Sequence, residues 1–508
     1  MEYHLNKRSV SQRRNALDTA SEQSVDFDLT LPDYCPDIER ILSCTLDPKI
    51  YIANVSGDRL NIEGGACVRV MYADGDSGCV RSYEYTRPFS ESLPLKESIS
   101  DCAVYVEAKP EYLNCRALSP RKLSLHGAFT LYATVAVADE LDYYTAESGD
   151  DLQVKGERME VSSLCGLCTD SFNVQEDIPF GERDEVNALL SHRLTAKITE
   201  LKAISGKIML SAELKLDILY LCGADERDIR CMTFGIPVSR VIDCAGADED
   251  AVIDGELSVM SDELHMGGNA PDGSSVPELE AKLSFSAICY REEEIEVLAD
   301  AFSTDRDTEL RFSPFSCKGG VDCRSFTDVG RADLHIDDEI GKITDVRCTK
   351  ISSSHTETDG SVLVEAKLCI GILYENGEGE TRCAERDAVF TMRPDIGDGD
   401  TVERLRVSLD SLSYRLTDSH SLEVRAELSC RMTVCRRCSC SAVTAVIADD
   451  DAPQKKSEGS LILYYADGGD SIWDISKRFC SRPADILAEN GTDGDTVGEG
   501  TMLLIPTA

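Results

Sequence analysis

The sequence predicts a mainly β protein with a small α+β tail, in which three tandem antiparallel, sandwich-like repeats precede a module of the order strand, helix, helix, strand. An alternating apolar stretch that ends at Tyr72 recurs before Tyr220 and again before Tyr374. These recurrences are spaced by about one ordinary domain of roughly 100 to 200 residues. The segment from Leu461 onward does not match the repeat, and its middle part carries apolar residues at helical spacing. The chain therefore divides into three copies of one β unit and a different tail.

Each repeat contains two long runs in which every second residue is apolar, the pattern of a half-buried strand. Turn-forming residues at 73–78 and 375–379 follow a run and favour hairpins, so we expect antiparallel sheets. A phenylalanine after each tyrosine is expected to anchor the core, and short helical pieces are predicted at 36–42 and 184–190. The runs are 62–72, 123–135, 210–220, 279–289, 364–374 and 422–434, and the phenylalanines are Phe89, Phe234 and Phe390.

Composition places the domain boundaries. Residues 449–460 are polar, charged and free of periodic apolar positions, which is typical of a linker. The expected division is a basic N-terminal segment at 1–25, repeats at 26–148, 149–303 and 304–448, the linker at 449–460 and the tail module at 461–508.

The charge of the chain excludes some partners. Lys and Arg total 52 against 93 Asp and Glu, a formal charge of −41 that repels nucleic acid and anionic lipid. No run approaches the roughly 18 uninterrupted apolar residues of a membrane span. The first residues lack the apolar core of a secretion signal, so we expect a cytoplasmic location and reduced thiols for the 22 cysteines.

The tail is predicted as a strand at 461–466, two helices and a last strand at 501–505. Asp470 is placed to cap the first helix, and Pro483 can open the second. Asn490 and the glycine after it can close the second helix.

This tail resembles the LysM module in the order of its elements and in a motif that runs through it, from the Gly-Asp-Ser-Ile-Trp of 469–473 to the Val-Gly-Glu-Gly-Thr-Met-Leu-Leu-Ile-Pro of 497–506. LysM modules bind N-acetylglucosamine glycans in a shallow groove between the first strand–helix loop and the loop before the last strand. The resemblance implies that this groove is formed by Gly469, Asp470, Ser471, Ile472, Trp473, Asn490, Val497 and Gly500.

Two functions of the groove stay open, because a fold alone does not fix function. Ser471, Ile472 and Glu499 depart from the common Thr, Leu and Pro of LysM modules, and residues 492–495 place two carboxylates at the groove mouth. The module could therefore bind a glycan, or it could dock another protein. The sole tryptophan, Trp473, is equally consistent with a surface contact and with packing.

Residues 31–42, Leu-Pro-Asp-Tyr-Cys-Pro-Asp-Ile-Glu-Arg-Ile-Leu, precede the first apolar run, and with it they resemble the SPOCS domain of spore-coat proteins. The second repeat departs most from this motif, at 185–190. Three such units and one LysM module resemble SipL-type coat morphogenetic proteins. The resemblance implies a non-enzymatic scaffold in the mother-cell cytoplasm at the forespore surface, which works with the ATPase of the coat's basement layer. The alternative is a peptidoglycan-binding protein of the cell wall or cortex.

Other motifs give weaker evidence of function. The Gly-Asp-Ser-Gly of 75–78 matches the surroundings of a serine-protease nucleophile but lies where the repeat needs a hairpin turn. Two cysteine motifs have the spacing of zinc ligands, without a nearby histidine, and oxidative crosslinking of exposed thiols is the rival hypothesis. No phosphate loop and no His-Glu-x-x-His is present, so neither an enzyme nor a cofactor or metal is expected. The motif cysteines are Cys165, Cys168, Cys435, Cys438 and Cys440.

Overall fold

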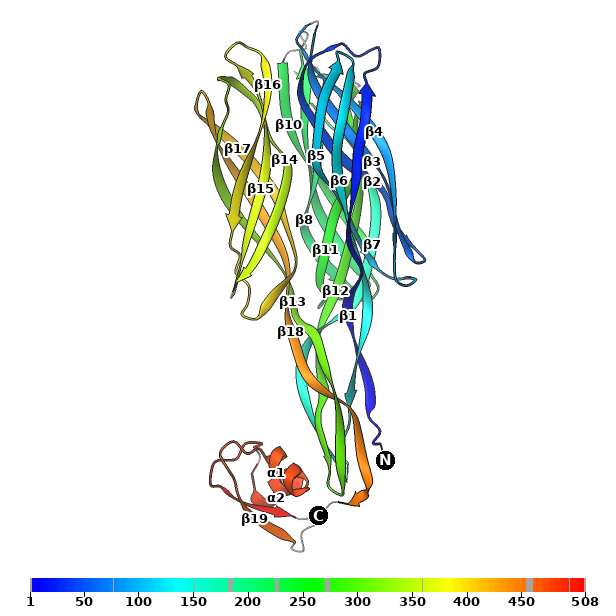
Figure 1. The fold of residues 1–508 in the computed structure, drawn as a ribbon, viewed down its shortest axis with the longest axis vertical. Coiled ribbons are helices and arrows are strands. Elements are labelled where there is room, and N and C mark those ends of the chain that lie inside the picture. The colour runs from blue at the N-terminus through cyan, green and yellow to red at the C-terminus, as the bar shows by residue number, and fades with distance from the viewer. Residues whose placement is uncertain are drawn as a thin grey trace.

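The protein consists of three similar β units and a small C-terminal module, as a computed structural model shows (Figure 1). The structure describes residues 2–75, 77–149, 151–180, 186–223, 228–269, 275–358, 360–453, 460–492 and 494–506. The prediction of a mainly β chain with antiparallel sheets and a small helical tail is confirmed. Among the described residues, no helix has the length and apolar character that crossing a membrane would require.

Each unit contains six strands. The first consists of β1 (Asn6–Thr30), β2 (Ile38–Ser56), β3 (Arg59–Asp74), β4 (Val80–Pro94), β5 (Ala103–Ser119) and β6 (Lys122–Thr145). The second consists of β7 (Leu152–Asp177), β8 (Val186–Ile204), β9 (Lys207–Cys222), β10 (Asp228–Asp243), β11 (Val252–Asn269) and β12 (Ser275–Ser303). The third consists of β13 (Arg306–His335), β14 (Ile340–Thr358), β15 (Ser361–Asn376), β16 (Thr381–Met392), β17 (Asp400–Asp418) and β18 (Ser421–Pro453).

All three units have one topology. In the first, the sheets have the orders β1-β6-β5 and β2-β3-β4, and the same orders recur in the second and third units. The alternating runs of the sequence are the central strands of these sheets, β3 and β6 and their counterparts. Their apolar residues face a shared core, in which Ile62 and Tyr72 of β3 belong to one cluster with Phe129 of β6. The period-two signal is strongest there because a central strand buries one whole face.

The prediction of short helices at 36–42 and 184–190 is wrong. Ile38 begins β2, Val186 begins β8, and residues 184 and 185 lie outside the described part of the chain. Both strands carry two register shifts near their starts, between Ile38 and Arg40 in the first case. A bulge inserts one extra residue into the alternation, so the apolar positions fall three and four apart, as they do in a helix.

The basic residues at 1–25 do not stand apart from the first unit in the structure. Residues 6–30 form β1, which pairs antiparallel with β6 from Asn6 opposite Thr145 to Thr30 opposite Lys122. Buried residues of this strand, such as Val10 and Val25, face the interior of the protein.

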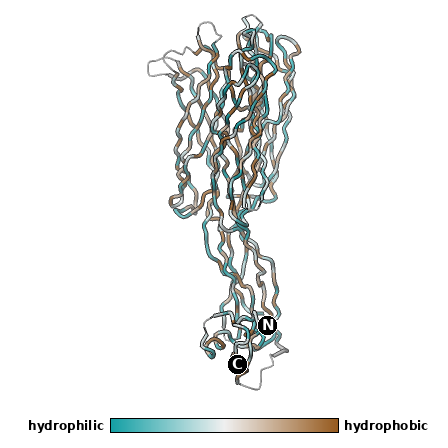
Figure 2. Tube along the Cα trace, turned by 90° about the vertical axis from the view of Figure 1, so that its left-hand side faces the viewer, coloured by the Kyte–Doolittle hydropathy of each residue, from teal (hydrophilic) through white to brown (hydrophobic). Residues whose placement is uncertain are grey.

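The three units pack against one another through apolar clusters that draw on all of them. At one end of the units lies one of these clusters, which we call the central cluster because it joins the three units. It contains residues from the second, third and fourth strands of the units. At the other end, the long strands continue below the units as a narrower stalk (Figure 1, Figure 2), built from the outer ends of β1, β6, β7, β12, β13 and β18. The central cluster consists of Leu42, Met71, Val80, Leu190, Leu219, Leu221 and Leu373.

Charged residues also join the units. Arg404 of β17 pairs with Asp254 and with Glu256 of β11, the latter at 3.2 Å, and its guanidinium lies 4.7 Å from the ring centre of Tyr105 on β5. Arg406 pairs with Glu256 as well. Because β5, β11 and β17 are the fifth strands of the three units, these contacts connect all three.

A second buried ionic contact lies between the first two units. His192 Nε2 lies 2.9 Å from Asp262 Oδ2, and Lys49 Nζ lies 3.5 Å from Asp262 Oδ1. Burial favours the neutral carboxyl, but the hydrogen bond from His192 and the charge of Lys49 outweigh it, so the pKa of Asp262 lies below its ordinary value.

This contact makes stability depend on pH. Because the folded pKa of Asp262 is depressed, its contribution is present above the ordinary carboxyl pKa of about 3.9 and is lost as the pH falls through the folded value. We expect Asp262→Asn to lower the urea midpoint at pH 7 and to flatten its fall between about pH 5 and the folded pKa. Urea unfolding from pH 7 to 2.5 measures this. Asp243→Asn, whose side chain is 86% exposed, is the control, and parallel pH profiles of Asp262→Asn and the unmutated protein would contradict the prediction.

Candidate functional site

The C-terminal module has the predicted order of elements: β19 (Leu461–Tyr465), α1 (Ile472–Phe479), α2 (Pro483–Asn490) and β20 (Met502–Pro506). The two strands pair antiparallel, with Leu463 opposite Leu504. Both helices contribute to a small core with the inner face of this sheet, made of Ile472, Ile475, Ile486, Leu503 and Ile505.

The structure brings together the two loops that the sequence analysis assigned to a groove. The backbone N–H of Ile472 donates to Asp495 O at 2.7 Å, and that of Val497 donates to Asp470 O at 3.3 Å. Gly469 and Gly500 have φ values of 97° and 77°, which a side chain would strain. Both glycines are exposed, and Val497 is half-buried.

The cap of α1 is Ser471 rather than Asp470. Ser471 Oγ accepts from the backbone N–H of Asp474 at 3.0 Å, as an N-cap does. Asp470 instead accepts from the hydroxyl of Tyr464 at 2.6 Å and from the N–H of Asp467 at 3.0 Å. These hydrogen bonds lower the pKa of Asp470, the Tyr464 hydroxyl being the larger cause. The Asp470 carboxylate therefore fastens the loop before α1 to β19.

Two of the expected groove residues serve the interior of the module. Ile472 is buried in its core. The side-chain amide of Asn490 donates to Ile486 O and Leu504 O at 2.8 and 2.7 Å, and its oxygen accepts from Leu504 N at 2.8 Å. Asn490 therefore joins α2 to β20, and its hydrogen bonds are engaged within the module.

Trp473 packs against the end of the stalk. Its ring lies 5.1 Å from that of Phe302 on β12 in a T-shaped arrangement, and its Nε1 donates to Asp300 Oδ2 at 2.8 Å. Lys477 of the same helix pairs with Asp300 at 2.6 Å. Of the two roles that the sequence left open, the structure supports packing, because Trp473 is 7% exposed and its ring contacts the second unit.

We expect Trp473→Ala to release the module from the stalk, because it removes both the ring contact with Phe302 and the hydrogen bond to Asp300. Truncation of a buried aromatic costs about 3–5 kcal/mol, which is enough to undo a contact of this size. Small-angle scattering should show a larger radius of gyration and a longer maximum dimension. Tyr465→Ala, on the exposed side of β19, should leave both unchanged. An unchanged scattering profile of Trp473→Ala would contradict the prediction.

A feature that the sequence analysis missed is an apolar surface on the outer face of the two-stranded sheet. We call it the tail's apolar face and define it by Leu461, Leu463, Tyr465 and Met502, which are 48%, 54%, 59% and 51% exposed. A sheet covered on one side should alternate apolar and polar residues, yet Leu461–Tyr465 reads Leu-Ile-Leu-Tyr-Tyr. This unbroken apolar strand was the signal that could have revealed it.

The cysteine motifs lie in strands. Cys168 and Cys435 are buried, while Cys165, Cys438 and Cys440 are half-buried. Cys168 contacts Cys244, a residue outside either motif.

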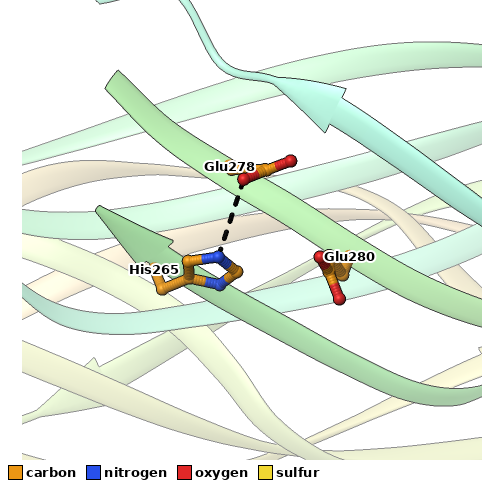
Figure 3. A group of neighbouring side chains, drawn as sticks. All are labelled: His265, Glu278 and Glu280. Atoms are coloured by element: carbon orange, nitrogen blue, oxygen red, sulfur yellow. Dashed lines mark ion pairs between the residues drawn. The ribbon is translucent and has the colours of Figure 1, made fainter. Parts of the chain in front are cut away.

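Only one group of three potential metal ligands was found in the described part of the chain, and the sequence analysis did not single it out. His265, Glu278 and Glu280 have ligand atoms within 4.8 Å of one another on the exposed face of β11 and β12 (Figure 3). His265 Nε2 lies 3.6 Å from Glu278, to which Gln175 also donates a hydrogen bond. Imidazole and carboxylates are ligands that suit a divalent transition metal. Strand register, which places His265 opposite Glu278, brings these residues together.

The Gly-Asp-Ser-Gly sequence lies in the turn between β3 and β4, and Asp76 lies outside the described residues. The Ser77 hydroxyl and backbone N–H donate to the carboxylate of Asp74 at 2.8 and 2.6 Å. Arg81 pairs with the same carboxylate at 3.1 Å. These contacts engage Ser77 in fixing the turn.

Comparison with known families finds a match in each of the first two units. The sequence model described as SipL, SPOCS domain, matches residues 37–118 and 185–263. These segments cover β2 to β5 of the first unit and, at the corresponding place, β8 to most of β11 of the second. The second matched segment lies in the second unit, which is the repeat whose sequence departs most from the motif at 31–42. No curated protein matches the chain. The first two units therefore carry SPOCS domains of the SipL type.

Proposed function

We propose that this protein is a non-enzymatic scaffold of spore coat assembly, which docks onto the ATPase of the coat's basement layer through its C-terminal module and SPOCS domains. The SPOCS matches support a role in the coat. Under this proposal the third unit is a further SPOCS domain, since it repeats the topology of the first two as paired, sandwich-like sheets. The module is of the LysM type, and the protein acts at the forespore surface in the mother cell.

The observation that carries protein docking is the tail's apolar face. Its four side chains are each about half exposed and lie side by side, because Tyr465 is opposite Met502 and Leu463 is opposite Leu504. Contiguous exposed apolar residues of this kind mark interaction surfaces, and covering them gains about 25 cal/mol per Å² of apolar area. The Tyr465 ring adds a large rigid contact, which interfaces favour.

The groove is less suited to carry the alternative function, glycan binding. Ile472 is buried in the core of the module, and Trp473 contacts the stalk. Asn490 joins α2 to β20 by hydrogen bonds. The exposed loops around Gly469 and Gly500 remain for a ligand. Peptidoglycan binding therefore serves as the competing outcome of the test.

The test is co-sedimentation of the full chain with the polymerised coat ATPase and, separately, with insoluble peptidoglycan. We expect Leu463→Glu to weaken capture by the ATPase polymer at least about tenfold, because it places a charge in an interface that must lose its water. Val389→Glu is the matched control, since Val389 of β16 is an exposed apolar residue at 59% exposure. Sedimentation with peptidoglycan and not with the ATPase would overturn the proposal, as would undiminished capture of Leu463→Glu.

A further inference from the structure

Three thiols lie in one buried cluster inside the second unit. Cys244 Sγ is 3.7 Å from Cys289 Sγ, and Cys168 belongs to the same buried cluster and lies near enough to lower the pKa of Cys244. Cys168, Cys244 and Cys289 are 8%, 1% and 0% exposed. Cys244 is therefore the thiol that interacts with both others.

The backbone around these thiols is built for close approach. Cys244 follows β10, in a loop that crosses β7 at a bulge between Leu164 and Gly166. A Cβ at Gly166 would lie 3.0 Å from Cys244 Sγ, and a Cβ at Gly246 would clash with the carbonyl oxygen of Cys165. Gly246 also has a φ of 86°. Two glycines thus let the loop seat Cys244 against the other sheet.

Cys244 is set apart from an ordinary buried cysteine by its partners. Hydrogen bonds from Cys168 and Cys289 lower the pKa of the Cys244 thiol, whereas burial alone raises the pKa of Cys430 on the central strand β18. The thiolate is the form of cysteine that reacts.

We propose that Cys244 is a redox-sensitive site, which hydroperoxides convert to a disulfide with Cys289 and which Cys168 can exchange. In the first step the Cys244 thiolate attacks a peroxide oxygen, and the O–O bond breaks to give the sulfenic acid and, after protonation, water. The sulfur of Cys289 then attacks the Cys244 sulfur and expels hydroxide, which takes up the Cys289 proton. Two thiols and one hydrogen peroxide yield one disulfide and two waters.

The third thiol gives the disulfide a way to rearrange. Attack of Cys168 on Cys244 would release the thiol of Cys289 and form the Cys168–Cys244 disulfide. Either bond joins the loop that follows β10, a strand of the sheet β10-β9-β8, to the other sheet, β11-β12-β7. Oxidation would thus tie together the two sheets of the second unit and raise its resistance to unfolding.

The test is peptide mapping of the full folded chain after treatment with hydrogen peroxide and alkylation under denaturing, non-reducing conditions. We expect a Cys244–Cys289 linked peptide in the unmutated chain and in Cys168→Ser, and a Cys168–Cys244 linked peptide in Cys289→Ser. Cys244→Ser should yield neither. The oxidised unmutated chain should also have a higher urea midpoint than the reduced chain, a gain that Cys244→Ser lacks.

Cys430 provides the internal control, because it is 0% exposed and burial is what raises the pKa of its thiol. Equal oxidation of Cys430 and Cys244 would overturn the proposal, since it would show reaction through unfolding. So would full alkylation of Cys244 after treatment, or a linkage of Cys244 to Cys165 in place of Cys289.

Discussion

Arg404→Ala is expected to lower the free energy of unfolding by about 3–5 kcal/mol, the range found when one partner of a buried ion pair is removed. The side chains of Asp254 and Glu256 are 2% and 7% exposed, and Arg404 is the group that approaches both. Burial works against the charged guanidinium, but Asp254, Tyr105 and Glu256 outweigh it and raise the pKa of Arg404. Its removal would leave Asp254 with Arg13 at 4.0 Å and Glu256 with Arg406, so each buried carboxylate would lose one of its cationic partners. The midpoint of urea unfolding, followed by circular dichroism, measures the loss.

The control for this substitution lies on the same strand. Arg415 of β17 is 74% exposed and pairs with Glu423 at 3.7 Å, so Arg415→Ala should cost no more than about 1 kcal/mol. Arg404→Met would remove the charge but keep much of the packing against Tyr105, and it therefore separates these two contributions to stability. If Arg404→Ala costs as little as Arg415→Ala, the contact between the units is hydrated and does not hold them together.

The sequence was sufficient to predict the class of fold and the central strands, because those strands bury one face over their whole length. The sequence led to a wrong prediction of helix at the starts of β2 and β8, because the register shifts there place apolar residues at helical spacing. The outer strands of each sheet were missed for a related reason. Many of their side chains lie at the surface, as the largely exposed second half of β4 shows, and they give a weak period-two signal.

In the tail, the sequence was sufficient for the order of elements, and insufficient for the use of each residue. Asp470 and Ser471 are neighbours with equally good capping side chains, and the hydroxyl of Tyr464 draws the first away from the helix. The contact of Trp473 with Asp300 joins positions 173 residues apart. Such a contact depends on how the module packs against a stalk made of all three units, and the local sequence pattern gives no information about this.

The ends of β3, β9 and β15 carry a signal that is readable in retrospect. Each ends in five consecutive buried residues or contains such a run, as in the Ile-Leu-Tyr-Leu-Cys of β9. A strand buried on both faces reads as a continuous apolar run in place of an alternating one. Tyr220 faces the core of its own unit, and Leu219 faces the central cluster between units. The repeated strand therefore encodes the contact between units as well as the unit itself.

Leu219→Ala is accordingly expected to cost about 2–5 kcal/mol, as much as Leu214→Ala in the core of the second unit. Both side chains are almost fully buried, at 2% and 0% exposure. A cavity between units destabilises the native state as a cavity within one does, provided that the units unfold together. Val241→Ala, at 61% exposure on the neighbouring β10, should change the urea midpoint little.

The comparison of the two leucines decides whether the three units form one cooperative body. Equal losses for Leu219→Ala and Leu214→Ala, with one transition for each, would mean that the central cluster belongs to the same cooperative unit as the core beneath Tyr220. A loss below about 1 kcal/mol for Leu219→Ala alone would mean that the units fold independently and only touch. In the cooperative case, a partner that binds the folded chain at any one point stabilises all three units, because the free energy of binding is shared by everything that unfolds with the site.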